Sequence, residues 1–265
     1  MSTKKTKLDN RETLKNYFKN GTRPSEENFG SLIDSMINKA DDGISKNLTD
    51  GLLLAPEGED SNRTLSFINK IGEERPAWSV ELLKGETPGL GIMQPTSNNT
   101  KEDKTRMFFH NNGNIGIHTD TPKTDLEVKG ILGIQSRIGT YKLDTVPADG
   151  NWHTILEGLD GTNGFEVMAH VGLKGTGKHA LLQATALATF GQFKNRIRRT
   201  QASFGWLWWN RLAIRWTGNQ DNYKLELKTR SNYGKDGKTG KVVKIKFYIT
   251  QFWGNDIMLL FDDQS

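Results

Sequence analysis

Tryptophan and arginine side chains that could bind a ligand are concentrated in one stretch of the C-terminal half. The candidate contact residues are Trp206, Trp208, Trp209, Arg211, Arg215 and Trp216. Both residue types dominate binding hot spots, and their flat groups stack on sugar rings or other planar ligands. If the stretch is a strand, Trp206 and Trp208 share one face, whereas Leu207 and Trp209 share the other. One pair is then expected in the core, and the other either packs between subunits or contacts a ligand.

A run of basic residues lies just before this aromatic stretch. It contains Lys194, Arg196, Arg198 and Arg199. Such a run is either a plain solvated face or a surface that complements an anionic polysaccharide or lipopolysaccharide. We therefore add Arg198 and Arg199 to the candidate ligand contacts.

Other residues could support catalysis, but none forms a complete set. Segment 172–179 nearly matches a phosphate-binding P-loop, yet His179 stands where a magnesium-binding hydroxyl is needed, so we expect a hairpin loop. The Gly-x-Ser-x-Gly motif of serine hydrolases does not occur. Glu157, Asp160 and Glu166 lie in one region of the sequence, which leaves a polysaccharide lyase or glycosidase as an alternative. We expect no enzymatic activity and no cofactor.

The five histidines show no spacing that is typical of a metal site. No two of them are two or four residues apart, so none are placed as neighbouring ligands on a strand or helix. Isolated histidines are more often hydrogen-bonded structural residues than ligands. The one special possibility is His118, because three copies of it around a threefold axis could bind a metal. We expect no metal.

Composition excludes several classes of protein. The chain has no cysteine, so it has no disulfide framework and no thiolate site. Its first residues lack the apolar stretch of a secretory signal, and no window reaches the roughly 18 apolar residues of a membrane span. Residues 131–265 contain 18 Lys+Arg and 11 Asp+Glu, a net charge of +7, and the rest of the chain carries −2. We expect a protein made in the cytoplasm, not inserted in membranes, whose basic half favours anionic partners.

The N-terminal residues 1–43 predict two short helices. Leu14, Tyr17 and Phe18 have helical spacing, and Gly21 follows as a stop. Ser25 is a natural N-cap for a second helix, which ends near residues 39–43. We expect this pair to attach the chain to a larger particle through apolar side chains: Tyr17, Phe18, Phe29, Leu32, Ile33 and Met36.

Residues 44–130 contain short apolar segments between turn residues, which predicts short strands. The segment 111–130 alternates isolated glycines with isoleucines, makes a Thr-x-Thr-Pro turn and ends in a Leu-x-Val strand. Strands this short and poor in bulk cannot build a core from one chain, and glycine permits close backbone approach. We therefore expect this part to form the neck or shaft of a trimer, and Ile115, Ile117, Leu126 and Val128 to make contacts between its three chains.

Residues 131–265 have the size of one β-sandwich. Several runs alternate apolar and polar residues, most clearly 223–229 and 242–249, so one face is expected in the core and the other in water. Segment 180–190 is rich in alanine and is ambiguous between a strand and a tightly packed helix. The expected fold is thus mainly β, with a short helical pair, a trimeric fibre-like neck and a C-terminal sandwich.

Two motifs resemble those of tail fibres. Segment 113–130 is similar to the GNIGIGTTxPxxxLxVxG element of trimeric phage and phage-tail-like fibres, with His118 standing where the family usually has glycine. Segment 14–43 looks like an LKxYFxxG…LIDSxxNKxDDG element of proteins encoded beside contractile injection systems. The resemblance implies a homotrimer that attaches to baseplate or other particle proteins, is released outside the cell with the particle, and contacts a cell-surface glycan or lipopolysaccharide.

Alternatives remain for each module. The N-terminal pair could be any small helical hairpin, or a DNA-binding helix-turn-helix. Glu26 and Glu27 at the start of the second helix disfavour contacts with base edges, so we expect no nucleic acid partner. Within the particle, the chain could be a baseplate, collar or cap adaptor without a receptor role. From another class, it could be a surface-polysaccharide depolymerase.

Overall fold

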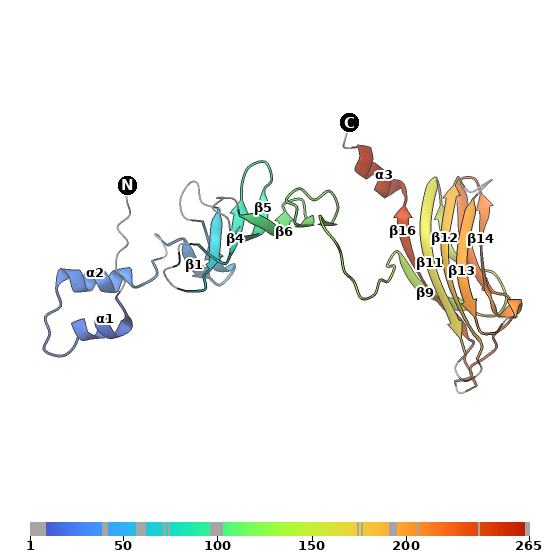
Figure 1. Ribbon diagram of the computed structural model, residues 1–265, viewed down its shortest axis with the longest axis horizontal. Helices are drawn as coiled ribbons and strands as arrows, with labels where there is room; N and C mark the ends of the chain where they lie inside the picture. Colours follow the sequence, from blue (N-terminus) through green and yellow to red (C-terminus); the bar gives the residue numbers. More distant parts are fainter. Residues whose placement is uncertain are drawn as a thin grey trace. The chain divides into compact units, whose positions relative to one another are not determined.

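The chain is mainly β and divides into two compact units, Met1–Leu132 and Gly133–Ser265 (Figure 1). The computed structural model describes residues 9–38, 42–56, 62–70, 73, 75–95, 103–173, 175, 177–190, 195–205, 207–237 and 239–262. The expectation of a mainly β protein with a short helical pair at its N-terminus is confirmed.

The N-terminal unit begins with helices α1 (Arg11–Tyr17) and α2 (Glu26–Asp34). The predicted cap is confirmed, because Ser25 and Asn28 form a reciprocal capping box at the start of α2. The rings of Phe18 and Phe29 meet edge to face at 5.3 Å, yet neither helix buries any residue.

The predicted end of the second helix is wrong. Helix α2 ends at Asp34, and Met36 and Ile37 lie beyond it with exposed side chains. The hydroxyl of Ser35 donates to the carbonyl of Leu32 (2.7 Å), and the Met36 amide bonds to Ile33 rather than to Leu32. These bonds replace the next helical turn. Residues 39–41, in the predicted helix end, lie outside the described residues.

The rest of this unit is made of short strands. A hairpin pairs β1 (Ile44–Asn47) with β2 (Gly51–Leu54). A six-stranded sheet follows in chain order: β3 (Arg63–Phe67), β4 (Trp78–Leu83), β5 (Gly89–Gln94), β6 (Lys104–His110), β7 (Ile115–Ile117) and β8 (Leu126–Val128). All neighbours are antiparallel except the parallel pair β7–β8. Among the described residues of this unit, the buried apolar side chains are Met93, Phe108 and Pro122.

The C-terminal unit contains two antiparallel sheets. The five-stranded sheet has the order β13 (Arg196–Ser203), β12 (His179–Thr189), β11 (Thr162–Gly172), β16 (Lys244–Trp253), β9 (Lys142–Pro147). The three-stranded sheet has the order β10 (His153–Leu159), β15 (Asn222–Thr229), β14 (Leu212–Asn219). A 3-10 helix η1 (Trp208–Asn210) precedes β14, and helix α3 (Asn255–Asp262) follows β16 (Figure 1).

One hydrophobic cluster joins the two sheets of this unit. It contains Phe165, Leu182 and Ile249 from the larger sheet and Tyr223 and Leu225 from the smaller one, all fully buried. The ambiguous segment 180–190 is strand β12, whose even-numbered residues are buried and whose odd-numbered residues are exposed. Alanine at four of the five buried positions lets the neighbouring layer approach closely.

Candidate functional site

The outward face of the three-stranded sheet gathers positive charge along strand β15. Tyr223, Leu225 and Leu227 are fully buried in the core, so Lys224 and Lys228 point the opposite way. Arg230 continues this alternation just after the strand, since its amide bonds to the carbonyl of Arg211. Arg215 of β14 lies opposite Glu226 in the ladder. We call Arg215, Lys224, Lys228 and Arg230 the cationic strip.

A nearly buried carboxylate holds one end of the cationic strip. Glu226 is 7% exposed and accepts a hydrogen bond from the Nε of Arg215 (2.8 Å), with the Nζ of Lys224 at 3.6 Å. Burial raises the pKa of Glu226, but the hydrogen bond and charge of Arg215 and the charge of Lys224 outweigh it, so the net pKa is lowered. Glu226 is therefore ionised at neutral pH and fixes the position of Arg215.

Trp152 lies between two cations of the strip. The guanidinium of Arg215 is 4.1 Å from the centre of the indole, and the ammonium of Lys228 is 4.7 Å from it. Both distances are typical of cation–π contacts. Trp152 was not predicted as a site residue, because nothing in the linear sequence links it to residues more than 60 positions away.

A short turn places Trp152 at the sheet. Asp149 accepts hydrogen bonds from the Asn151 amide (2.9 Å) and from His153 Nε2 (2.8 Å). The hydrogen bond with His153 lowers the pKa of Asp149 to about 2. Gly150 has a φ of +90° and donates its amide to the hydroxyl of Thr229 at the end of β15 (3.1 Å). The turn is thus tied to the strand that carries the lysines.

The possible strand around Trp208 and Trp209 does not form. These residues form η1, and Trp206 lies outside the described residues. The expected alternation, with one tryptophan in the core, does not hold: Trp208 is 57% exposed and Trp209 is 43% exposed. Their rings meet edge to face at 6.0 Å, and the Arg230 guanidinium lies 5.5 Å from the centre of the Trp208 ring. Trp208 therefore extends the cationic strip.

Hydrogen bonds from distant residues fix this 3-10 turn. The hydroxyl of Tyr233 donates to the carbonyl of Asn210 (2.7 Å), and that of Ser231 donates to the carbonyl of Trp209 (3.0 Å). The buried Asn210 side chain donates to the carbonyl of Phe204 (2.9 Å). The exposed tryptophans thus stand on a well-bonded backbone.

The remaining predicted contacts lie apart from the strip. Trp216 is partly buried and packs on the rings of Phe165 and Tyr223, with ring centres 6.5 and 5.5 Å away. Its role in this structure is packing. Arg211 is exposed beside η1.

The basic run 194–199 does not form one face. Arg198 and Arg199 lie on β13 of the five-stranded sheet, opposite Thr185 and Ala184. Because Ala184 is buried and Thr185 is exposed, the two arginines point to opposite faces of that sheet. Lys194 lies outside the described residues.

A polar pocket of about 520 Å³ adjoins the far end of the strip. It is lined by Glu157, Gly158, Gly218, Asn219, Asn222 and Lys224. Carboxylate and amide oxygens accept hydrogen bonds and Lys224 donates them, so the pocket suits a ligand that carries hydroxyl groups.

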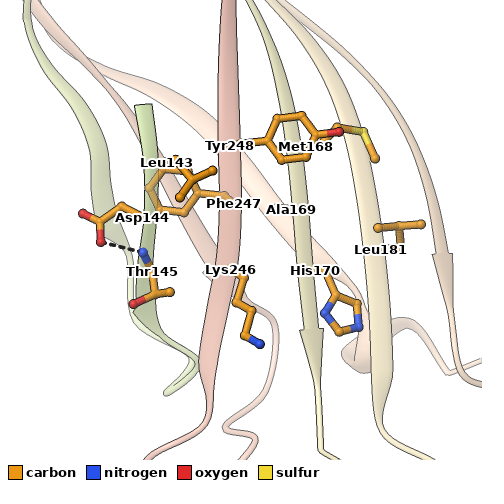
Figure 2. Close-up of a pocket in the computed structure, with 10 residues that line it drawn as sticks. All are labelled: Leu143, Asp144, Thr145, Met168, Ala169, His170, Leu181, Lys246, Phe247 and Tyr248. Atoms are coloured by element: carbon orange, nitrogen blue, oxygen red, sulfur yellow. Dashed lines mark hydrogen bonds between the residues drawn. The ribbon is translucent and has the colours of Figure 1, made fainter. Parts of the chain in front are cut away.

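The outward face of the five-stranded sheet is different, because it holds an apolar groove of about 410 Å³. Figure 2 shows Leu143, Tyr248 and Met168 in one row and Lys246 and His170 in the next, as the strand register requires. Burial lowers the pKa of His170, and the charges of His179 and Lys246 lower it further.

The segment that nearly matches a P-loop is a hairpin connection, as predicted. Gly172 pairs with His179 across antiparallel strands β11 and β12, so no helix follows the loop. Lys174 and Thr176 lie outside the described residues. Of the three predicted carboxylates, Glu166 is bound to Arg137 and Gln183. In the described ranges, no group of three or more His, Cys, Asp or Glu side chains could hold a metal ion.

The Gly-Ile segment forms short strands of the six-stranded sheet. Strand β7 pairs with β6 on one side and β8 on the other. Ile115, Ile117 and Val128 are half-buried, whereas Leu126 is 59% exposed. A Cβ added to Gly116 would lie 2.2 Å from the carbonyl oxygen of Thr119, so this glycine permits a turn of its own chain.

His118 adopts a left-handed conformation, with a φ of +59°. Only glycine takes this region without cost, so the conformation costs energy for a histidine. The Nη1 of Arg106 lies 3.3 Å from the Nε2 of His118, and this contact helps to hold the turn.

No protein-family model matches this sequence, and no curated protein matches it. Among the described residues, no helix is long and apolar enough to cross a membrane.

Proposed function

We propose that this chain is a non-enzymatic structural and receptor-binding component of a phage-tail-like contractile injection particle, and that it acts as a homotrimer. Its helical pair attaches to the baseplate or another particle protein, its short strands form the neck, and its C-terminal unit is a β-sandwich that contacts a glycan or lipopolysaccharide of the target cell. After release, the chain is extracellular as part of the particle.

The observation that carries this proposal is the scarcity of core in the N-terminal unit. Beside the three buried apolar side chains of its described residues, many large ones are exposed in its strands: Leu52, Leu53, Leu65, Phe67, Trp78, Leu82, Leu90, Phe109 and Leu126. Nine such side chains in short strands exceed the scattered exposure of an ordinary monomer. Packing against two identical chains would bury them.

The exposed attachment residues support the role of the helical pair. Phe29, Ile33 and Met36 are at least half exposed, although they form the apolar side of the pair. A helix gains most of its stability from packing of its apolar face, so a seven-residue and a nine-residue helix need a partner surface.

The five-stranded sheet offers a second surface for contact between copies. Leu143, Leu181 and Leu187 are 66%, 46% and 47% exposed on its outward face. Strands of 6 to 11 residues at a spacing of about 4.8 Å give a face of about 19 by 30 Å, or about 580 Å². That is near the ~600 Å² per partner at the lower end of stable interfaces.

The solution mass of the full-length protein tests the proposal. A trimer of the 29.8 kDa chain has a mass of about 89 kDa by light scattering. A monomer at micromolar concentration would refute the trimeric neck.

The receptor role has its own test. We expect Trp208→Ala to abolish cell adsorption of assembled particles and to leave both trimer mass and particle assembly unchanged, because Trp208 is exposed. Tyr141→Ala is the matched control, since it removes another exposed aromatic residue away from the strip. Loss of assembly with intact adsorption would instead identify an adaptor.

A further inference from the structure

We infer that the cationic strip binds an acidic polysaccharide, a chain that carries carboxylate, sulfate or phosphate groups together with free hydroxyls. This inference rests on the proposed receptor role and specifies its ligand. It places the site on the three-stranded sheet and not at the basic run of β13.

The charge of the strip matches a polyanion. It contains four cations, and among the described residues Glu226 is the carboxylate that forms ion pairs with them, so these five groups carry a net charge of +3. Glu226 occupies only part of the donor capacity, since the arginine guanidinium has five N–H donors and the ammonium of lysine has three. Arg215, Lys224 and Lys228 keep exposed or half-exposed side chains that can reach a ligand.

The cations are held in place before a ligand binds. Arg215 is fixed by Glu226 and Trp152, Lys228 lies on Trp152, and Arg230 lies on Trp208. Ordering a long side chain on binding costs conformational entropy, so side chains that are already ordered bind more tightly. Aromatic rings therefore support the cations here, and Trp208, which is 57% exposed, is accessible for stacking on a sugar ring.

Hydrogen-bond acceptors along the strip favour a polysaccharide over a nucleic acid. The polar pocket beside Lys224 brings Glu157, Asn219 and Asn222 together. A carboxylate there repels the dense phosphates of a nucleic acid, whereas it accepts hydrogen bonds from sugar hydroxyls. From Lys224 to Arg230 the strip advances six residues, about 20 Å, which accommodates several consecutive sugar rings.

Binding of defined polymers to the full-length protein tests the inference. The acidic polysaccharide probes are polygalacturonate and heparin. Dextran is the neutral polysaccharide, and duplex DNA is the polyanion that is not a polysaccharide. The strip variant is Lys224→Gln, Lys228→Gln, Arg230→Gln, which leaves the Arg215–Glu226 pair intact. The control is Arg196→Gln, Arg198→Gln, Lys244→Gln, which removes the same charge from exposed positions of the other sheet.

We expect at least one acidic polysaccharide to bind, with an affinity that falls as salt rises, and no binding of dextran. The strip variant should bind at least ~10-fold more weakly, and the control variant should bind within about twofold of the unmodified protein. Equal weakening in both variants, preference for DNA, binding to dextran alone, or no binding to any polymer would overturn the inference.

The outcome separates this inference from the proposed function. Light scattering of the same samples reports the trimer, and an unfolding midpoint confirms that each variant is folded. A trimer whose particles adsorb to cells but whose strip variant binds acidic polymers normally would remove the strip and keep the proposed function. A monomer that still binds acidic polymers through the strip would remove the proposed trimer and keep the strip as a binding site.

Discussion

The substitution Glu226→Gln should weaken the C-terminal unit and strengthen its binding to acidic polymers. Glutamine keeps the shape of the side chain and removes its charge, so Arg215 and Lys224 lose their common partner. Two measurements on one variant are thus expected to move in opposite directions. A merely structural residue would change stability alone.

The size of the effect follows from the burial of the three groups. Breaking a fully buried ion pair costs about 3–5 kcal/mol, and an exposed pair is worth about 0–1 kcal/mol. The Glu226 side chain is 9% exposed, but those of Arg215 and Lys224 are 45% and 43% exposed, so solvent screens them. We expect the free energy of unfolding to fall by about 1–2 kcal/mol, and Tm by about 3–8 °C.

The pH dependence of the stability difference provides a separate check on the sign of this effect. The pKa of Glu226 in the folded protein lies below its ordinary value of 4.5, so its contribution is complete above pH 4.5 and is lost as pH falls through the lowered pKa. The stability difference between the unmodified protein and Glu226→Gln should therefore shrink below pH 4.5. Urea unfolding at several pH values measures it. Equal stability at pH 7, or a difference that grows in acid, would refute the reasoning.

Three other substitutions test the turn, the core and the Gly-Ile segment. Asp149→Asn should lower the free energy of unfolding at pH 7. The unmodified protein loses the stabilisation from Asp149 between pH 3.8 and about 2, because the pKa of this carboxyl is lowered to about 2. Acid unfolding should show that the variant lacks this loss. Tyr223→Phe removes two hydrogen bonds of a fully buried hydroxyl, and urea unfolding should show a loss of about 1–2 kcal/mol. Gly116→Ala places a Cβ 2.2 Å from the Thr119 carbonyl oxygen, and urea unfolding should show that this overpacking lowers the free energy of unfolding by about 1–3 kcal/mol.

Each of these three has a matched control. Asp221→Asn, in an exposed turn, should leave acid unfolding unchanged. Tyr248→Phe loses one weak bond of 3.3 Å at the surface and should change stability by less than about 0.5 kcal/mol. Gly30→Ala adds a Cβ in open space on helix α2 and should be neutral or slightly stabilising. A control that changes as much as its partner would contradict the local cause assigned to that partner.

The sequence predicted strands where one face is buried and the other is wet. Strand β15 alternates tyrosine and leucine with charged residues, and the structure buries the predicted face. The period of two is a direct consequence of strand geometry, so it can be read without a structure. Helix α2 ended early because the hydroxyl of Ser35 competes for a backbone carbonyl, which periodicity does not report.

The site could be predicted only in part. Trp208 and Arg215 were identified by residue type, but Trp152, Lys224 and Lys228 were not. The wet face of β15 was visible as alternating charges, yet its neighbours depend on the register between β14, β15 and the turn before β10. Likewise the 3-10 turn at Trp208 is fixed by hydrogen bonds from residues more than 20 positions later in the chain. A local sequence pattern cannot predict such contacts.

The two outward faces of the C-terminal unit differ in a way that bears on assembly. The face of the larger sheet carries exposed leucines and an apolar groove, and the face of the smaller sheet carries the cationic strip. Like charges repel when copies pack through the same patch, so the strip is a poor contact between identical chains. Apolar side chains have no such penalty. If the larger sheet packs against other copies in the proposed trimer, the three cationic strips remain exposed, and a ligand with repeated charges can bind more than one of them at a much higher effective concentration.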